Sequence, residues 1–412
     1  MEKIFYKDNI EGIEVSYQQM LNDLALQDSY SIYCKSNSFY IIFKHIILSL
    51  LIGKEAILLD EDFSNEEINK LIGNNKDIFA PKAYIPIGQI NFEDIEERIS
   101  KNKSSWKITM FTSGTTGLPK KISHNYESIS RSIKIEDNRK ENIWGFSYNP
   151  THMAGVQVFF QAFLNQNTIV RLFGVNRVES LNLIKDCEIT NISATPTFYR
   201  LLLPADHICI SVKNLTSGGE KFDSKTLQRL NQMFPNSRIR NIYASTEAGA
   251  LFASEGDVFS VKSEIAHLIK FFENELYIHK SLIGQSEGLK ILDGWYQTGD
   301  LIEIISKKPN TFRFVSRKNE MINTGGYKVN PLEVEDVIRL CEGVTDVLVF
   351  AKKNSLLGNL VICEVVRHNE LLTEKQIRFF LQDKLQEFKI PRIIKFVESL
   401  KITRTGKIIR KK

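Results

Sequence analysis

The sequence predicts an α/β protein with a smaller α+β region at its C-terminal end. Residues 30–34 and 56–59 are apolar runs typical of buried strands, and residues 39–52 form an apolar run long enough for a buried helix. Ser64 and Glu67 are spaced as a capping box, which begins a second helix. A succession of strand, helix, strand and helix predicts a parallel sheet covered by helices.

The C-terminal quarter has a different order of elements. Asn330 and Pro331 are an N-cap and N1 pair that begins a helix running to about residue 340. Two apolar runs typical of strands follow, then a helix capped by Thr373 and a last strand near 392–397. This order predicts a small α+β domain, and 412 residues leave room for two or three domains of the usual ~150 residues.

Composition limits the class of protein. A hydrophobic content of 42% and a charged content of 25% are those of an ordinary globular chain. The net charge of +5 is too slight to imply nucleic-acid binding. The five cysteines are far apart, which predicts free thiols in a reducing cytoplasm. The N-terminus does not resemble a secretory signal, and the apolar run 39–52 is too short to span a bilayer, so we expect no stable membrane insertion.

The loop after the strand-like residues 107–110 is the strongest candidate for a binding site. It reads Phe111-Thr112-Ser113-Gly114-Thr115-Thr116-Gly117-Leu118-Pro119-Lys120. Glycines allow backbone N–H groups to point inward, and hydroxyls and a lysine add donors and positive charge, so a polyphosphate is the expected guest. The spacing is not that of a Walker A loop. The alternative is a polar surface turn.

Further polar motifs follow at the ends of predicted strands. Each is common when it stands alone: paired glycines before an acid form ordinary turns, Thr-Glu can begin a helix, and a lysine in a basic tail is usually solvated. In chain order they are Ser217-Gly218-Gly219-Glu220, Tyr243-Ala244-Ser245-Thr246-Glu247, Thr298-Gly299-Asp300, Ser316-Arg317, Gly325-Gly326-Tyr327 and Thr403-Arg404-Thr405-Gly406-Lys407.

Together and in this order, these motifs resemble those of the AMP-forming acyl-adenylate superfamily, which includes acyl- and aryl-CoA synthetases, luciferases and peptide-synthetase adenylation domains. The compact length is most similar to ligases of the o-succinylbenzoate-CoA type. The resemblance implies a large domain of layered, helix-covered sheets, residues 1–318, joined by a hinge at Asn319 to a small mobile domain, residues 319–412. It also implies that the chain is an enzyme that activates a carboxylic acid as acyl-AMP and transfers the acyl group to a thiol.

The resemblance also implies roles for the motif residues. The loop from Thr112 to Lys120 would hold the pyrophosphate, and Gly218, Gly219, Glu220 and Ala244 would lie along the nucleotide. Tyr243 would stack on adenine, Asp300 would hold the ribose, and Thr246 would bind the α-phosphate. Arg317 would bind the ribose or a phosphate. Glu247 would hold Mg²⁺, which prefers oxygen ligands and keeps several waters. Lys407 would act between the carboxylate and the α-phosphate.

His152 belongs to the segment that lines the acid pocket in the family, so the resemblance makes it a wall residue beside the carboxylate. The alternative is a capping or core histidine before a helix. Residues 143–164 contain no Asp or Glu. An ammonium group would lack a partner there, which favours a plain carboxylic acid over an amino acid.

The acceptor is left open by the sequence. Gly326 and Tyr327 would meet the thiol, which belongs either to CoA or to the phosphopantetheine of a carrier protein. A third possibility is a non-catalytic nucleotide-binding homologue, because four positions depart from the family pattern: Lys121, Ala244, Asn319 and Ile402. ATP, Mg²⁺ and a small acid are therefore the expected ligands, and the presence of Lys407, Glu247 and Asp300 favours catalysis.

Overall fold

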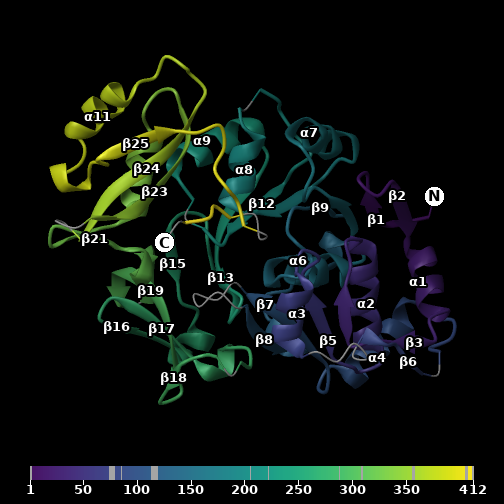
Figure 1. Cartoon of the computed structure of the whole chain (residues 1–412). Helices are drawn as coiled ribbons and strands as arrows, with labels where there is room; N and C mark the ends of the chain where they lie inside the picture. The colour runs from purple at the N-terminus through teal and green to yellow at the C-terminus, as the bar shows by residue number, and fades with distance from the viewer. Residues whose placement is uncertain are drawn as a thin grey trace.

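The computed structural model describes residues 2–73, 79–84, 86–112, 119–204, 206–220, 222–286, 288–307, 310–354, 358–403 and 407–410. These residues form two helix-covered sheets, an antiparallel sheet and a C-terminal lobe (Figure 1), and the N-terminal strands β1 (Ile4–Asp8) and β2 (Ile13–Ser16) belong to the larger of the two helix-covered sheets. The mixed α/β class expected from the sequence is confirmed.

The largest sheet among the described residues has eight strands, of which the six inner ones are parallel and the two edge strands, β14 and β2, are antiparallel to their neighbours. In spatial order the strands are β14 (Gly249–Ser254), β13 (Arg238–Ser245), β12 (Asn214–Gly218), β11 (Asn191–Ala194), β9 (Ile143–Phe146), β10 (Thr168–Arg171), β1 (Ile4–Asp8) and β2 (Ile13–Ser16).

A second sheet carries the strands that flank the predicted phosphate loop. Its first three strands are parallel, and β7 and β8 form an antiparallel pair. The strands are β4 (Tyr33–Lys35), β5 (Ala56–Leu59), β7 (Lys107–Thr112) and β8 (Lys120–Asn125), and a separate short pair consists of β3 (Ser29–Tyr30) and β6 (Lys82–Ala83).

Alternation along the strands explains the layering of the large part. In β5, Ala56 and Leu58 face one core and Ile57 and Leu59 face another, because successive side chains of a strand point to opposite faces. The first core contains α2 and α6, which lie between the two sheets, and the second contains α3. Across the large sheet, α7, α8 and α9 cover the remaining face. The helices are α1 (Tyr17–Ala25), α2 (Phe39–Leu51), α3 (Asn65–Ile72), α4 (Phe92–Asn102), α5 (Tyr126–Ser130), α6 (Met153–Phe163), α7 (Arg177–Asp186), α8 (Pro196–Leu202) and α9 (Ser224–Met233).

An antiparallel sheet connects this part to the C-terminal lobe. Its inner face packs around Phe312, which is fully buried among other aromatic and aliphatic side chains. The strands are β15 (Val258–Ser260), β20 (Asn310–Arg317), β19 (Trp295–Lys307), β17 (Glu275–His279) and β16 (Ile269–Phe272), with β18 (Ile291–Leu292) paired to β19.

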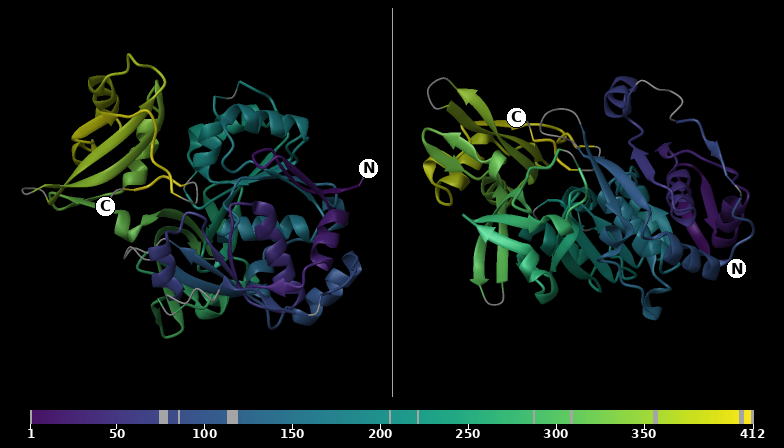
Figure 2. Two further views of the ribbon diagram at one scale, coloured as in Figure 1. Left: turned by 45° about the vertical axis from the view of Figure 1, so that its right-hand side comes forward. Right: turned by 90° about the horizontal axis from the view of Figure 1, so that it is seen from below.

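The C-terminal lobe has its own hydrophobic core, formed by side chains from Ile322 to Phe396. It stands beside the rest of the molecule in both further views (Figure 2). The α+β composition predicted for this region is confirmed. The elements are the hairpin β21 (Ile322–Thr324) and β22 (Tyr327–Val329), the sheet β23 (Val344–Asn354), β24 (Gly358–Arg367) and β25 (Ile393–Phe396), and the helices α10 (Pro331–Arg339) and α11 (Glu374–Gln382).

Two of the predicted elements are wrong in detail. The single strand expected over residues 30–34 is two strands, β3 and β4, which pair with different partners. The polar residues after the 107–120 motif, 126–135, have the pattern of one helix in the sequence, but the helix ends at Ser130. Beyond it, the backbone amides of Lys134 and Glu136 donate to the side chains of Gln161 on α6 and Asn165 just after α6, so tertiary hydrogen bonds replace the helical ones.

Candidate active site

A cavity of about 850 Å³ lies at the carboxyl ends of β12 and β13 and continues along the face of the large sheet, under α6. Its volume is within the range of small-molecule binding sites. In parallel sheets, ligands bind at the carboxyl ends of strands. The predicted site residues that line it are Gly218, Gly219, Ala244, Thr246, His152 and Lys407.

Lys407 lies directly against the backbone of Gly219. A Cβ built on Gly219 would be 2.6 Å from Cε of Lys407 and 2.9 Å from Nζ. Gly219 also has a φ of 84°, in the left-handed region that favours glycine. The backbone conformation at position 219 therefore favours glycine, and the absence of a Cβ lets the end of the lysine side chain approach the backbone.

Charged groups surround the ammonium of Lys407. Burial lowers the pKa of Lys407 below that of a free lysine, and the charge of Glu220 opposes this shift. Glu247 and Asp300 also favour the charged form, whereas Arg317 disfavours it. The lysine is thus held in a partly desolvated place between carboxylates, where an added phosphate would favour its charged form.

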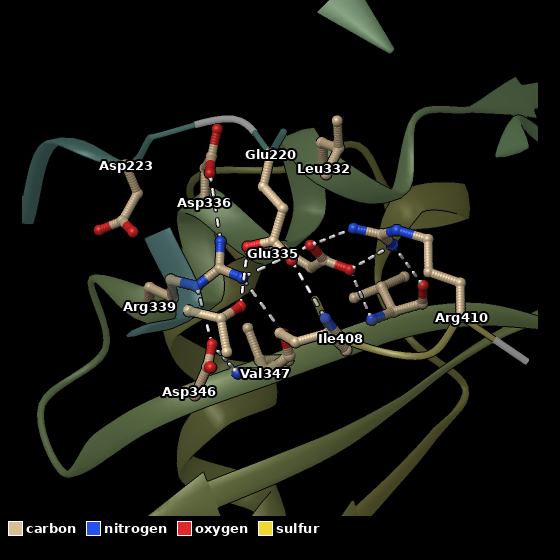
Figure 3. A network of polar contacts seen from close by, with 12 residues as sticks. Glu220, Asp223, Leu332, Glu335, Asp336, Arg339, Asp346, Val347, Ile408 and Arg410 are labelled. Carbon is tan, nitrogen blue, oxygen red and sulfur yellow. Dashed lines mark hydrogen bonds and ion pairs between the residues drawn. The ribbon is translucent and has the colours of Figure 1, made fainter. Parts of the chain in front are cut away.

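Hydrogen bonds on both sides of the lobe boundary hold the segment that carries Lys407. The amide of Ile408 donates to Glu220 at 3.0 Å, and the guanidinium of Arg410 donates to Glu335 at 2.7 and 2.9 Å (Figure 3). Glu335 is 1% exposed and belongs to α10 of the lobe. The C-terminal segment is therefore tied to the large part through Glu220 and to the lobe through Glu335.

A second set of ion pairs joins the lobe to the large part directly. Arg200 of α8 lies 3.1 Å from Asp346 of β23, and Asp346 also pairs with Arg339 of the lobe at 3.1 Å. On the large part, Arg200 also pairs with Glu220 and Asp223. Arg339 and its partners are part of the same network (Figure 3).

Glu220 was expected to contact the nucleotide. Its carboxylate is engaged by protein groups, since it accepts hydrogen bonds from the hydroxyl of Thr197 at 2.7 Å and from the amide of Ile408 at 3.0 Å. In this arrangement Glu220 positions the segment of Lys407, and its predicted nucleotide contact stays a prediction.

Asp300 and Tyr243 lie together, and neither lines the cavity. The Tyr243 hydroxyl donates to Oδ2 of Asp300, and Nε of Arg317 lies 3.0 Å from Oδ1. Asp300 is 3% exposed, and burial raises the pKa of its carboxyl, whereas Arg317 and the Tyr243 hydrogen bond lower it. The Tyr243 ring packs tilted against Phe252 and edge-on against Phe312. Stacking on adenine and capture of two ribose hydroxyls stay predictions, and both require these groups to exchange partners.

Thr246 and Glu247 follow β13 directly, and a residue that the sequence analysis missed fixes their backbone. His124 of β8 is 1% exposed, with Nε2 2.8 Å from the carbonyl oxygen of Thr246 and Nδ1 2.8 Å from the hydroxyl of Ser128. Burial lowers the pKa of His124 to about 4. A neutral imidazole therefore links the strand after the phosphate loop to Thr246.

His152 is the N-cap residue of α6, but its side chain makes no capping hydrogen bond. Instead its Nε2 lies 3.1 Å from Oδ1 of Asp60, which is 4% exposed. Asp60 also accepts hydrogen bonds from the Thr151 hydroxyl and, at 3.2 Å, from Asn149. Asp60 was not predicted as a site residue. The one local feature that could have indicated it is an acid directly after a buried strand.

Asp60 also bears on the kind of acid expected. The structure brings it next to the segment 143–164, which has no acid of its own. Its carboxylate is occupied by Thr151, Asn149 and His152, and Asp60 does not line the cavity. The expectation of a plain carboxylic acid stays a prediction.

The remaining predicted residues are placed only in part. Thr112 and Lys120 are directly opposite each other in the β7–β8 pair. The five predicted loop residues between them, Ser113, Gly114, Thr115, Thr116 and Gly117, lie outside the described residues.

Gly326 and Tyr327 belong to the hairpin of the lobe and do not line the cavity. The Tyr327 ring is 56% exposed and stacks on Phe388 at 4.4 Å. In this arrangement the surface predicted to meet the thiol is therefore turned away from the site.

The described residues hold no cluster of three or more His, Cys, Asp or Glu side chains able to bind a metal by themselves. The Glu247 carboxylate, half-buried beside the cavity, has no hydrogen bond or ion pair with any described residue. One free carboxylate beside the cavity fits an ion that takes most of its ligands from substrate and water. No helix among the described residues is long and apolar enough to cross a membrane.

A two-lobed α/β chain with a lysine from the small lobe placed at the strand ends of the large one has the architecture of an adenylate-forming enzyme. The chain belongs to the AMP-binding enzyme family, whose model matches residues 19–277, and the model of the AMP-binding enzyme C-terminal domain matches residues 333–407. It is an AMP-forming ligase of the acyl-CoA synthetase class.

Relatives and solved structures agree with this assignment. The chain is 26% identical to a putative long chain fatty acid-CoA ligase of Staphylococcus epidermidis, over 73% of this chain and 69% of the relative. It is 25% identical to the 2-succinylbenzoate–CoA ligase of the same organism, over 84% and 80%. Its fold matches o-succinylbenzoate CoA synthetase from Bacillus subtilis with a TM-score of 0.72 at 17% identity, covering 99% of this chain and 94% of that one. ATP-bound MatB from Rhodopseudomonas palustris matches with a TM-score of 0.73 at 15% identity, with the same coverage.

Proposed function

We propose that this protein activates a carboxylic acid with ATP and transfers the acyl group to the thiol of CoA. In the first step, a carboxylate oxygen attacks the α-phosphorus, the bond to the β-phosphate oxygen breaks, and acyl-AMP and pyrophosphate form. In the second, the thiol sulfur attacks the acyl carbon and AMP leaves. The observation that carries the proposal is Lys407, which lies against Gly219 in a cavity bordered by Thr246 and His152.

The first step needs positive charge where negative charge develops. Lys407 supplies it between the carboxylate and the α-phosphate, and the Thr246 hydroxyl donates to the α-phosphate. Lys120 and the hydroxyls of the loop that starts at Thr112 neutralise the departing pyrophosphate. Glu247 holds Mg²⁺, which adds positive charge on the phosphates when bound. His152, fixed by Asp60, forms the wall beside the carboxylate.

When the nucleoside binds, Asp300, Tyr243 and Arg317 give up their bonds to one another and contact the nucleoside instead. The ribose hydroxyls replace Tyr243 and Arg317 as partners of Asp300, because a carboxylate offers both oxygens as acceptors. The released Tyr243 ring stacks on adenine, and Gly218 and Ala244 leave room for the base. Arg317 turns to the ribose or phosphate.

The second step needs a different position of the small domain. We place the boundary between residues 1–318 and 319–412, with Asn319 as the hinge, between β20 of the antiparallel sheet and the first strand of the lobe. Rotation about it withdraws Lys407 and brings Gly326 and Tyr327 to the acyl-AMP. Gly326 and Tyr327 are exposed in this arrangement, which supports the rotation, because contact with the thiol substrate at the active site would bury them.

The acceptor and the place of action follow from the same reasoning. CoA is preferred over a carrier-protein phosphopantetheine because the named relatives are CoA ligases. A cytoplasmic location suits a chain whose described cysteines are all free, and ATP and CoA are cytoplasmic substrates. The surface charge gives no reason to add a nucleic-acid partner.

The test measures acid-dependent pyrophosphate release from ATP and Mg²⁺ with aryl, short-chain and long-chain acids, each with and without CoA. Release that depends on one acid, with formation of its CoA thioester, is the expected result. Acyl-AMP that accumulates despite CoA would move the acceptor to a carrier protein. Lys407→Ala should abolish release and keep thioester formation from synthetic acyl-AMP, and an equal loss in both would contradict the role of Lys407.

A further inference from the structure

The cavity extends well beyond the place of the chemistry. From Ala244 and Thr246 at the end of β13, it continues back along the strand to Ile242, Arg240 and Arg238. These alternate residues share one face of β13 because the side-chain period of a strand is two. Arg240 comes four residues before Ala244, roughly 13 Å along the strand.

The floor of this extension is polar. Thr216 of β12 is the direct neighbour of Arg240 in the sheet, and its hydroxyl donates to Ser193 of β11 at 2.6 Å. Deeper along the same strands, the amide of Asn214 donates to Asn191 at 2.8 Å. A tunnel for a plain fatty acid would be lined by apolar side chains, because polar groups lose water when an alkyl chain covers them.

The described lining is also strongly basic. It holds one carboxylate, Glu255, against six cations besides Lys407: Arg131, Lys134, Arg139, Arg238, Arg240 and Lys262.

Several of these cations are already engaged. Arg238 pairs with Glu255, and Arg139 pairs with Glu136 at 2.7 Å. Arg131 donates to the carbonyl oxygen of Ala248 at 3.3 Å. Among the described residues, only Arg139 and Arg238 of these cations are paired with a carboxylate, so the excess of positive charge rests on Arg131, Lys134, Arg240 and Lys262.

Two of these four cations are half-buried, Arg131 and Arg240, whereas Lys134 and Lys262 are exposed to solvent. Arg131 already donates to the carbonyl oxygens of Ala248 and Leu282. The side chain of Arg240 has no hydrogen bond or ion pair with any residue in the part of the chain that the structure describes. A half-buried guanidinium without a counter-ion is costly, and its planar fork matches a carboxylate with two parallel hydrogen bonds. The cavity is complementary to an anionic group at this point.

We propose that the acid substrate carries a second carboxylate, which Arg240 binds at the far end of the cavity while the first carboxylate is activated beside Lys407. The inference rests on the proposed function and narrows its substrate to dicarboxylic acids. Arg240 is then a specificity residue. A monocarboxylic acid of equal length leaves Arg240 desolvated and unpaired, so the enzyme discriminates against it.

The experiment compares matched acids on three proteins: the native enzyme, Arg240→Gln and Arg238→Gln. The pairs are decanedioate with decanoate, and 2-succinylbenzoate with 4-oxo-4-phenylbutanoate. Each pair differs by one carboxylate. Arg238→Gln is the matched control, because it removes an equal charge from the same face of β13 at a residue already paired with Glu255.

For the native enzyme, kcat/KM for pyrophosphate release should favour the diacid of at least one pair by about 10- to 100-fold, the range expected for a charge-assisted pair. Arg240→Gln should remove this preference and leave the value for the monoacid within twofold, and Arg238→Gln should retain the preference. Equal use of both acids by the native enzyme, or an equal loss for both acids in Arg240→Gln, would overturn the inference. An effect of Arg238→Gln as large as that of Arg240→Gln would also overturn it.

A binding measurement separates this inference from the proposed function. Thermal stabilisation by the diacids without ATP should be present in the native protein and absent in Arg240→Gln. If no acid supports pyrophosphate release but this difference persists, the proposed function fails and the anion site stands. If neither diacid stabilises the native protein more than its monoacid, the second-carboxylate inference fails.

Discussion

The tie between Arg410 and Glu335 can be tested because it should affect only one of the two half-reactions. Arg410 follows Lys407 by three residues and donates to Glu335 at 2.7 and 2.9 Å, and its Nε lies 3.3 Å from Glu320. Arg410→Met keeps the unbranched apolar part of the side chain and removes these contacts. Glu335 retains Arg339 and the amide of Val349 as donors, so the lobe keeps its internal bonds.

The size of the effect follows from burial. The Glu335 side chain is 1% exposed and that of Arg410 is 25% exposed, so solvent screens the pair only in part. Removal of one member of such a pair costs about 3 kcal/mol, the low end of the range for buried pairs. If these ~3 kcal/mol destabilise only the conformation in which Lys407 lies in the cavity, adenylation slows by roughly 150-fold, because 1.36 kcal/mol corresponds to a factor of ten.

The assay measures the two half-reactions separately, as acid-dependent pyrophosphate release and as thioester formation from synthetic acyl-AMP. Adenylation should fall and thioester formation should stay within about twofold, because that step does not use Lys407 at the phosphate. Arg392→Met is the control, since Arg392 forms a longer, exposed pair with Glu387 at 3.5 Å. An equal loss in both half-reactions, or no loss in either, would refute the reasoning.

Three further predictions concern stability. Phe43→Ala should lower the free energy of unfolding by about 3–5 kcal/mol in denaturant titrations, because the ring is fully buried, and the exposed Phe379→Ala should change it little. Burial lowers the pKa of His45 to about 4, so the unfolded chain binds a proton first as pH falls. As the pH falls from about 6.5 to 4, His45 should therefore lower the free energy of unfolding by up to roughly 3 kcal/mol. His45→Gln should make that decline shallower, and an unchanged slope would contradict it. Ser64→Ala should cost about 1 kcal/mol through loss of its capping hydrogen bond, whereas a neutral result would show that the cap contributes nothing.

Elements that depend on neighbours in the sequence were predicted well. The capping box of Ser64 and Glu67 is present as expected, because both of its hydrogen bonds are made within four residues. The α+β order of the lobe also follows from local runs and caps. By contrast, the strand expected at 30–34 is divided, since its two halves pair with strands whose positions the local pattern does not contain.

The candidate site also has a part that the sequence predicted and a part that depends on distant segments. The order of the motifs predicted that Gly219, Thr246 and Lys407 belong to one site. All three line one cavity in the structure, although Lys407 is far from the other two in the chain. Asp60 and Arg240 were not predicted, because an acid after one strand and an arginine within another become meaningful only when a distant segment is placed beside them. Motifs in the sequence thus indicate the class of reaction. The residues proposed to recognise the acid substrate become apparent only from the packing of distant segments.

Gly219 leaves room at the backbone for the end of the Lys407 side chain. A Cβ there would overlap Cε and Nζ of Lys407, and at a φ of 84° it would also strain the backbone of residue 219. Because the overlap falls on the flexible end of the lysine, we expect Gly219→Ala to displace the ammonium from the cavity while it leaves every charge of the protein in place. In the proposed scheme of two domain positions, this one added methyl group would weaken adenylation and spare thioester formation.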